Sequence, residues 1–119
     1  MATFSKQILS GSTDGRAIKV AATASAGTLI HTGSSTATTL DEIWLYAYNS
    51  SSAAVVLTIQ WGSTTSPDDD IKLSIPATSG LTLVIPGLLI KGNATPLVVR
   101  AYAATTNVVT ISGYVNRIA

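Results

Sequence analysis

The sequence contains no cysteine, which excludes disulfides, thiolate metal sites and cysteine nucleophiles. It contains a single histidine, His31, and one histidine without any cysteine cannot supply the usual tetrahedral set of zinc ligands. Charged residues account for 11% of the chain, less than half of the roughly 25% that is usual in soluble domains. This low charge, together with 46% hydrophobic residues, argues against a disordered chain and against a long surface helix.

The balance of charge argues against two classes of partner. Seven basic and six acidic residues leave a net charge of +1, and the basic residues are scattered rather than clustered. Binding to phosphate backbones needs clustered Lys and Arg, so we expect no nucleic-acid partner. The most apolar stretch, residues 81–90, is interrupted by Thr82, Pro86 and Gly87 and is about half as long as a membrane span. We therefore expect no membrane partner.

Hydrophobic residues recur at every second position through most of the chain. Successive side chains of a strand point to opposite faces, so this alternation is typical of half-buried strands. The pattern is strongest over residues 43–48, 55–61, 71–75, 81–85, 97–103 and 109–116, and weaker over residues 4–9, 17–22 and 28–32. Turn signals such as Asp14-Gly15 separate these segments, and no window keeps a helical spacing. We predict an all-β, two-sheet antiparallel sandwich, jelly-roll-like, with eight or nine strands.

The chain is predicted to form one sandwich domain over residues 17–119, preceded by an N-terminal arm over residues 1–16. We expect the arm to contact a neighbouring subunit or another protein, because it mixes apolar and basic residues. Residues 24–39, rich in Ser, Thr, Ala and Gly, are expected to form a long loop around a short strand. The middle positions of the apolar faces predict five core residues, Leu57, Ile59, Leu83, Val99 and Ile111.

No motif in the sequence indicates an enzyme or a cofactor. His31 is accompanied by no G-x-S-x-G elbow, so we interpret it as a surface or packed histidine. Asp41 and Glu42 are neighbours at the start of a predicted strand and point to opposite faces, so this pair alone cannot flank a glycosidic bond. Glycine-rich phosphate-binding loops are also absent.

Asp68, Asp69 and Asp70 form the densest charge cluster. Three carboxylates in a loop could take part in a Ca²⁺ site, but the D-x-D-x-D-G spacing is missing. A solvated loop, or an ion-pair partner for a neighbouring chain, is the interpretation that we favour. Whether the cluster binds a metal is left open.

Aromatic residues gather on one face of one predicted strand. Trp44, Tyr46 and Tyr48 alternate with aliphatic residues that suit the core. The aromatic side chains could fill the rim of the sandwich, form a contact surface, or stack on a sugar, to which Trp61 could also contribute. Low charge and an aromatic stripe together favour a contact surface, so we expect an interface that involves Phe4, Lys6, Ile8, Trp44, Tyr46 and Tyr48.

Five segments of the chain resemble a known group of proteins. They are DEIWLYAYN (41–49), VLTIQWG (56–62), IPATSGL (75–81), IPGLL (85–89) and ISGYVNRI (111–118). Over about residues 40–118 they resemble small β-sandwich virion proteins of tailed bacteriophages, in particular capsid decoration (cement) proteins. The resemblance implies a jelly-roll subunit, commonly a trimer, bound to the major capsid protein on the outside of an icosahedral head. The strand pattern is more regular than that of lambda-type decoration proteins.

These observations favour a non-enzymatic virion protein that binds and stabilises an assembled capsid. The first residues contain no apolar run of a secretion signal, so we expect synthesis in the bacterial host cytoplasm. Two alternatives stay open: a phage tail, connector or fibre subunit with the same sandwich, and a carbohydrate-binding jelly-roll module.

Overall fold

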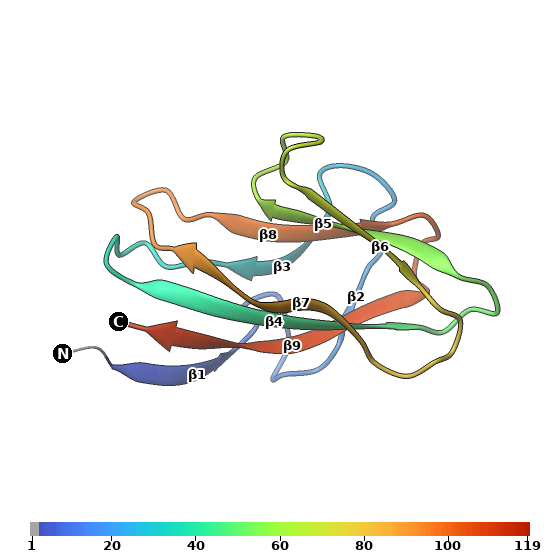
Figure 1. Ribbon diagram of the computed structural model, residues 1–119, viewed down its shortest axis with the longest axis horizontal. Helices are drawn as coiled ribbons and strands as arrows, with labels where there is room; N and C mark the ends of the chain where they lie inside the picture. The colour runs from blue at the N-terminus through green and yellow to red at the C-terminus, as the bar shows by residue number, and fades with distance from the viewer. Residues whose placement is uncertain (1–2) are drawn as a thin grey trace.

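A computed structural model describes residues 3–119 of the chain. These residues form strands, turns and loops, with no helix among them, which confirms the all-β prediction (Figure 1). The nine strands are β1 (Phe4–Ile8), β2 (Ile18–Lys19), β3 (Thr28–Thr32), β4 (Leu40–Asn49), β5 (Val55–Gly62), β6 (Asp70–Ile75), β7 (Thr82–Lys91), β8 (Val98–Ala103) and β9 (Val109–Ile118).

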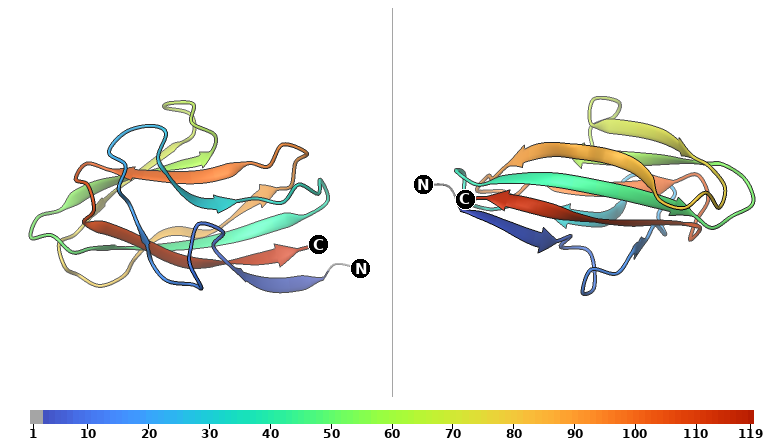
Figure 2. Two further views of the ribbon diagram at one scale, coloured as in Figure 1. Left: turned by 180° about the vertical axis from the view of Figure 1, so that it is seen from behind. Right: turned by 60° about the horizontal axis from the view of Figure 1, so that its bottom comes forward.

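The strands form two sheets that pack face to face (Figures 1 and 2). Sheet A has five strands in the order β1-β9-β4-β7, with β2 pairing with β9 beyond the end of β1. Sheet B has four strands in the order β3-β8-β5-β6. Every strand pair is antiparallel.

The pairing order is that of a jelly roll. β5 pairs with β6, β4 with β7, β3 with β8 and β2 with β9, so the chain is one long hairpin whose paired arms alternate between the two sheets. The pairs β4–β9 and β5–β8 then join neighbouring layers of this hairpin within each sheet. This rolled hairpin confirms the predicted jelly-roll-like sandwich, with β1 as the ninth strand beside β9.

The core lies between the sheets, and strand β4 shows how the sequence specifies it. Its side chains alternate between buried and half-buried along all ten residues, and Ile43, Leu45 and Ala47 have no exposed surface. Four of the five predicted core residues are also fully buried between the sheets, namely Leu57, Ile59, Val99 and Ile111.

The prediction that Leu83 is a core residue is wrong, because this side chain is 45% exposed. Ile85 lies opposite Leu45, but Leu83 lies opposite Tyr46, so β7 carries one extra residue between these pairs. Such a bulge reverses which face the following side chains occupy. Leu83 therefore shares the outward face of Tyr46, although it stands two residues from the buried Ile85.

The N-terminal segment is part of sheet A. β1 pairs with β9 of the same chain, and Leu9, which follows it, is buried in the core. Met1 and Ala2, which belong to the expected arm, lie outside the described residues. Contact between this segment and another chain stays a prediction. The expected loop around a short strand is present, because β3 interrupts residues 24–39.

Candidate interaction surface

The outward face of sheet A brings together all six residues that were expected at an interface. In the strand register Phe4, Lys6 and Ile8 lie opposite Ile118, Asn116 and Tyr114 of β9. The same face of β9 lies opposite the aromatic residues of β4. We call this surface the outer face; it comprises Phe4, Lys6, Ile8, Lys19, Leu40, Glu42, Trp44, Tyr46, Tyr48, Leu83, Pro86, Leu89, Lys91, Thr110, Ser112, Tyr114, Asn116 and Ile118.

Large apolar side chains are exposed across the outer face. The exposed fractions are 72% for Phe4, 52% for Ile8, 45% for Leu83 and 53% for Leu89. Strand lengths and spacings of about 3.3 Å per residue and 4.8 Å between strands give the face an area of roughly 600 Å². The largest apolar patch on a typical monomer is about 300–600 Å², and such patches are often functional. Seven of the eighteen residues of the outer face are polar or charged, so its apolar part is smaller than the whole face and falls within the range of such patches.

The outward face of sheet B differs, because the chain covers part of it. Thr58 and Gln60 point away from the core but are only 3% and 1% exposed. The loop between β2 and β3 lies over Gln60: the Gly27 amide donates to Gln60 Oε1 at 2.9 Å, and Gln60 Nε2 donates to Ser25 Oγ at 2.8 Å. Arg100 Nη1 also donates to the Gly27 carbonyl. No comparable covering contact holds a loop on the outer face among the described residues.

Aromatic rings at the centre of the outer face are held in place by their neighbours. The rings of Trp44 and Tyr114 lie nearly parallel, with centroids 6.3 Å apart and an interplanar angle of 13°. Lys6 Nζ lies 5.2 Å from the centroid of Tyr114. The indole of Trp44 occupies the space beside Gly87, where an added Cβ would be 2.8 Å from Cζ2. Gly87, with φ of 80°, therefore provides both the backbone conformation and the room that this ring needs.

Glu42 is the acidic residue of the outer face, and it is already engaged. Its Oε2 accepts hydrogen bonds from Trp44 Nε1 at 2.7 Å and from Asn116 Nδ2 at 3.1 Å. These two hydrogen bonds lower the pKa of Glu42 below its ordinary value, and the one from Trp44 has the larger effect. A shallow cleft of about 320 Å³ beside it is lined by Phe4, Ser5, Lys6, Glu42, Asn116 and Ile118.

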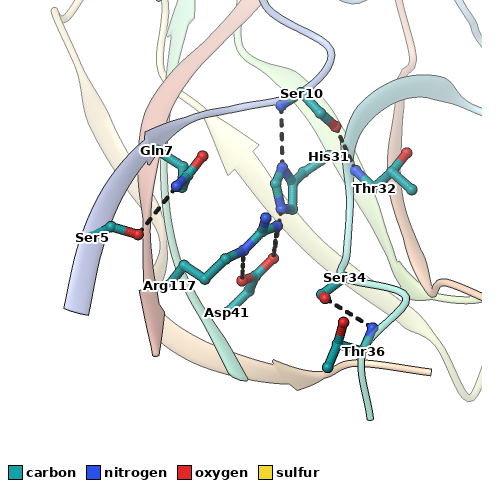
Figure 3. A network of polar contacts seen from close by, with 9 residues as sticks. All are labelled: Ser5, Gln7, Ser10, His31, Thr32, Ser34, Thr36, Asp41 and Arg117. Atoms are coloured by element: carbon teal, nitrogen blue, oxygen red, sulfur yellow. Dashed lines mark hydrogen bonds and ion pairs between the residues drawn. The ribbon is translucent and has the colours of Figure 1, made fainter. Parts of the chain in front are cut away.

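A buried polar network lies at one end of the sandwich, between the two sheets (Figure 3). Asp41 is only 1% exposed and accepts hydrogen bonds from Arg117 Nε at 2.8 Å and Arg117 Nη2 at 2.9 Å. His31 Nε2 lies 2.9 Å from Asp41 Oδ2, and His31 Nδ1 accepts the backbone N–H of Ser10 at 3.1 Å. Because Nδ1 accepts, the ring proton is on Nε2 and His31 donates it to Asp41 as a neutral imidazole.

This network has the composition of a Ser-His-Asp triad but not its chemistry. In a triad the histidine faces the serine hydroxyl and removes its proton. Here His31 faces the backbone amide of Ser10, while Ser10 Oγ accepts a hydrogen bond from the Thr32 amide at 2.6 Å. The network therefore joins β3, β4, β9 and the segment after β1, and no nucleophile is activated in it.

Burial raises the pKa of Asp41, but the hydrogen bonds from Arg117 and His31 outweigh it, so the net pKa lies below the ordinary value. The hydrogen bond to Asp41 in turn raises the pKa of Arg117. Sequence reasoning placed Asp41 and Glu42 correctly on opposite faces at the start of a strand, but it missed this role. The signal in the sequence was the alternation of side chains along the strand: Asp41 is two residues before Ile43 and four before Leu45, so it points inward with them.

The Asp68–Asp70 cluster lies in the loop between β5 and β6 and extends to the first residue of β6. Asp69 Oδ2 accepts the Thr65 amide at 3.2 Å, and Asp70 Oδ2 accepts the Ser66 hydroxyl at 2.8 Å. Within residues 3–119, no group of three or more His, Cys, Asp and Glu side chains is arranged to hold a metal ion.

No protein-family model matches the chain, and comparisons with curated proteins and with solved structures give no match either. Among the described residues there is no helix long and apolar enough to cross a membrane. Function is therefore inferred from the sequence and from the surfaces described above.

Proposed function

We propose that the protein is a non-enzymatic virion structural protein that binds the outside of an assembled phage capsid and stabilises it. The outer face of sheet A is the docking surface. One observation carries the proposal: the six residues expected at an interface share one exposed face, while the opposite side of the same strands is filled by the core. A face of this size is at the upper end of what monomers expose, and such patches are often functional.

The capsid is the partner because of the sequence resemblance over residues 40–118 and because a repeating lattice suits this surface. A single face of roughly 600 Å² is somewhat smaller than one side of a standard interface, about 800 Å². A subunit with such a face gains from multivalency when it assembles as a homo-oligomer, with a trimer as the expected state, on several neighbouring shell subunits. Binding then favours the assembled lattice over the free major capsid protein.

Two other functions would use the same outer face. A phage tail, connector or fibre subunit would use the outer face against a different virion partner. A carbohydrate-binding module is favoured by one specific observation: the half-buried rings of Trp44 and Tyr114 lie nearly parallel beside the polar groups of Glu42 and Asn116, as they would in a sugar-stacking platform.

The test is co-sedimentation of the purified protein with assembled heads from the same source as the gene. Tyr46→Ser removes an aromatic ring from the outer face, and Tyr102→Ser removes one from the outward face of sheet B as a matched control. We expect the first substitution to weaken head binding at least tenfold and the second to leave it within about twofold. Equal effects of the two substitutions would contradict the proposal.

The same assay separates the alternatives. Binding to isolated tails but not to heads would move the protein to the tail or connector class. Retention on a polysaccharide column, lost in Trp44→Ala and unchanged in Trp61→Ala, would assign the outer face to a glycan instead.

A further inference from the structure

The charges of the outer face stand around its apolar centre. Lys6 lies on β1, Lys19 on β2 opposite Thr110, and Lys91 at the end of β7 opposite Leu40. Between them lie the half-buried rings of Trp44, Tyr46, Tyr48 and Tyr114, together with Glu42, Thr110, Ser112 and Asn116. The face therefore has a largely aromatic centre, with lysines on three different strands around it and the Lys6 ammonium reaching over the Tyr114 ring.

Glu42 does not neutralise these lysines by direct pairing. Its hydrogen-bond partners are Trp44 and Asn116, and no salt bridge joins it to a lysine among the described residues. Three lysines and one glutamate give the outer face a net charge of +2, larger than the +1 of the whole chain. The loop between β1 and β2 adds Asp14 and Arg16, which cancel.

The remaining acidic residues lie elsewhere. Asp41 points inward to Arg117. Asp68, Asp69 and Asp70 belong to the loop before β6 and its first residue, on the far side of the molecule from β1 and β2 in Figures 1 and 2. The molecule therefore has a basic docking face, while the acidic loop before β6 belongs to sheet B, whose outward face also carries Lys72 and Arg100.

We infer that the outer face docks on a surface of a different protein chain that is apolar at its centre and carries carboxylates around it. This inference rests on the proposed function and specifies the chemistry of the partner. Carboxylates opposite Lys6, Lys19 and Lys91 give electrostatic complementarity, which raises the association rate and fixes the orientation of docking. The same face of a second copy fits poorly, because a face-to-face pair would bring six lysines and two glutamates, a net charge of +4, to one interface.

The preference can be measured with two probes of matched shape and opposite charge, 4-phenylbutyrate and 4-phenylbutylamine. Each is titrated into ¹⁵N-labelled protein, and amide shifts are followed by NMR. We expect the carboxylate probe to shift amides of β1, β4 and β9 with an affinity at least fivefold higher than that of the amine. Equal affinity, or stronger binding of the amine, would overturn the inference.

Variants show whether the lysines cause the preference. In the triple variant Lys6→Gln, Lys19→Gln, Lys91→Gln the fivefold difference between the probes should disappear. Lys72→Gln changes a lysine on the outward face of sheet B and should leave the difference intact. Circular dichroism and the thermal midpoint establish that each variant is folded before it is titrated. A preference that persists in a folded triple variant would contradict the assignment to these lysines.

Head binding separates failure of the inference from failure of the proposed function. If Tyr46→Ser weakens binding to heads but the triple lysine variant does not, the face docks without acidic partners and the inference alone fails. If the wild-type protein binds heads and neither variant changes that binding, the outer face is not the docking surface and the inference fails with it; if the wild-type protein does not bind heads, the proposed function fails. Sedimentation velocity tests whether a second copy of this chain occupies the outer face instead. A dimer that dissociates in Leu83→Ser but not in the lysine variant would show that the face is a contact between copies, and it would overturn the inference.

Discussion

Removal of the guanidinium from Arg117 should destabilise the protein strongly, because it leaves a buried carboxylate without its main partner. Asp41 is 1% exposed and receives two of its three hydrogen bonds from Arg117, at 2.8 and 2.9 Å. Arg117→Met keeps a flexible apolar side chain of related length but removes both donors. Breaking one side of a buried ion pair costs about 3–5 kcal/mol, and because Arg117 is itself 29% exposed we expect a loss at the lower end, about 3 kcal/mol.

The loss can be read as a shift of the thermal midpoint. An unfolding entropy of about 2.1 cal/mol/K per residue gives roughly 0.25 kcal/mol/K for a chain of this length, so the midpoint should fall by roughly 12 °C. Thermal unfolding at pH 7, followed by circular dichroism, measures this shift. Urea unfolding gives the free energy independently.

Arg100→Met is the matched control for this substitution. Arg100 makes one hydrogen bond, from Nη1 to the Gly27 carbonyl at 3.2 Å, and it faces no buried carboxylate in the described part of the chain. Its loss should cost about 1 kcal/mol or less. If Arg117→Met costs no more than Arg100→Met, Asp41 does not depend on its partner and our reasoning about the network is wrong.

Four further results are expected. Because the pKa of Asp41 is lowered in the folded state, its contribution to stability is complete above about pH 5 and is lost as the pH falls through the folded-state pKa. Asp41→Asn should therefore reduce the loss of stability at acid pH, as measured by urea unfolding between about pH 2 and 7. Leu57→Ala should cost about 2–5 kcal/mol in urea unfolding, whereas Leu83→Ala, at a side chain 45% exposed, should cost less than half as much; equal losses would place both in the core. Gly87→Ala should lower the thermal midpoint, because the new Cβ would overlap the indole beside it at a φ of 80°; an unchanged midpoint would show that this contact is not tight. Tyr46→Ala should weaken head binding by about 1–3 kcal/mol while the midpoint changes little; a large fall in the midpoint with unchanged binding would make this tyrosine structural.

The alternation of side chains was sufficient to predict most strands and most of the core. Leu57, Ile59 and Ile111 are fully buried because β5 and β9 pair with their sheet neighbours without a register shift, so every second side chain stays on the inward face. The period fails in β7, where register shifts turn Leu83 outward. Pro86-Gly87 signals irregular backbone in the sequence, and one register shift occurs there, between the pairs Ile43–Leu88 and Trp44–Pro86. The other shift, between Ile85 and Leu83, depends on how β7 pairs with β4.

The outer face could be predicted only in part. Trp44 and Tyr46 are two residues apart, so the sequence alone places them on the same face of one strand. That Phe4 and Ile8 share it follows from the β1–β9 register, which joins the two ends of the chain and has no local signal. The buried network likewise depends on residues far apart in the sequence. The alternation of side chains alone would have placed Asp41 inward, where a carboxylate needs a hydrogen-bonding partner. It could not identify that partner as Arg117.

Side-chain footprinting by hydroxyl radicals, with and without assembled heads, tests the docking surface most directly. Oxidation of Trp44, Tyr46 and Tyr48 is quantified by mass spectrometry, and Tyr102 on sheet B is the internal control. We expect the three outer-face residues to be labelled in the free protein and protected at least severalfold in the head-bound protein, with Tyr102 unchanged. Unchanged labelling of all three residues in protein that has sedimented with heads would show that the outer face of sheet A is not the docking surface.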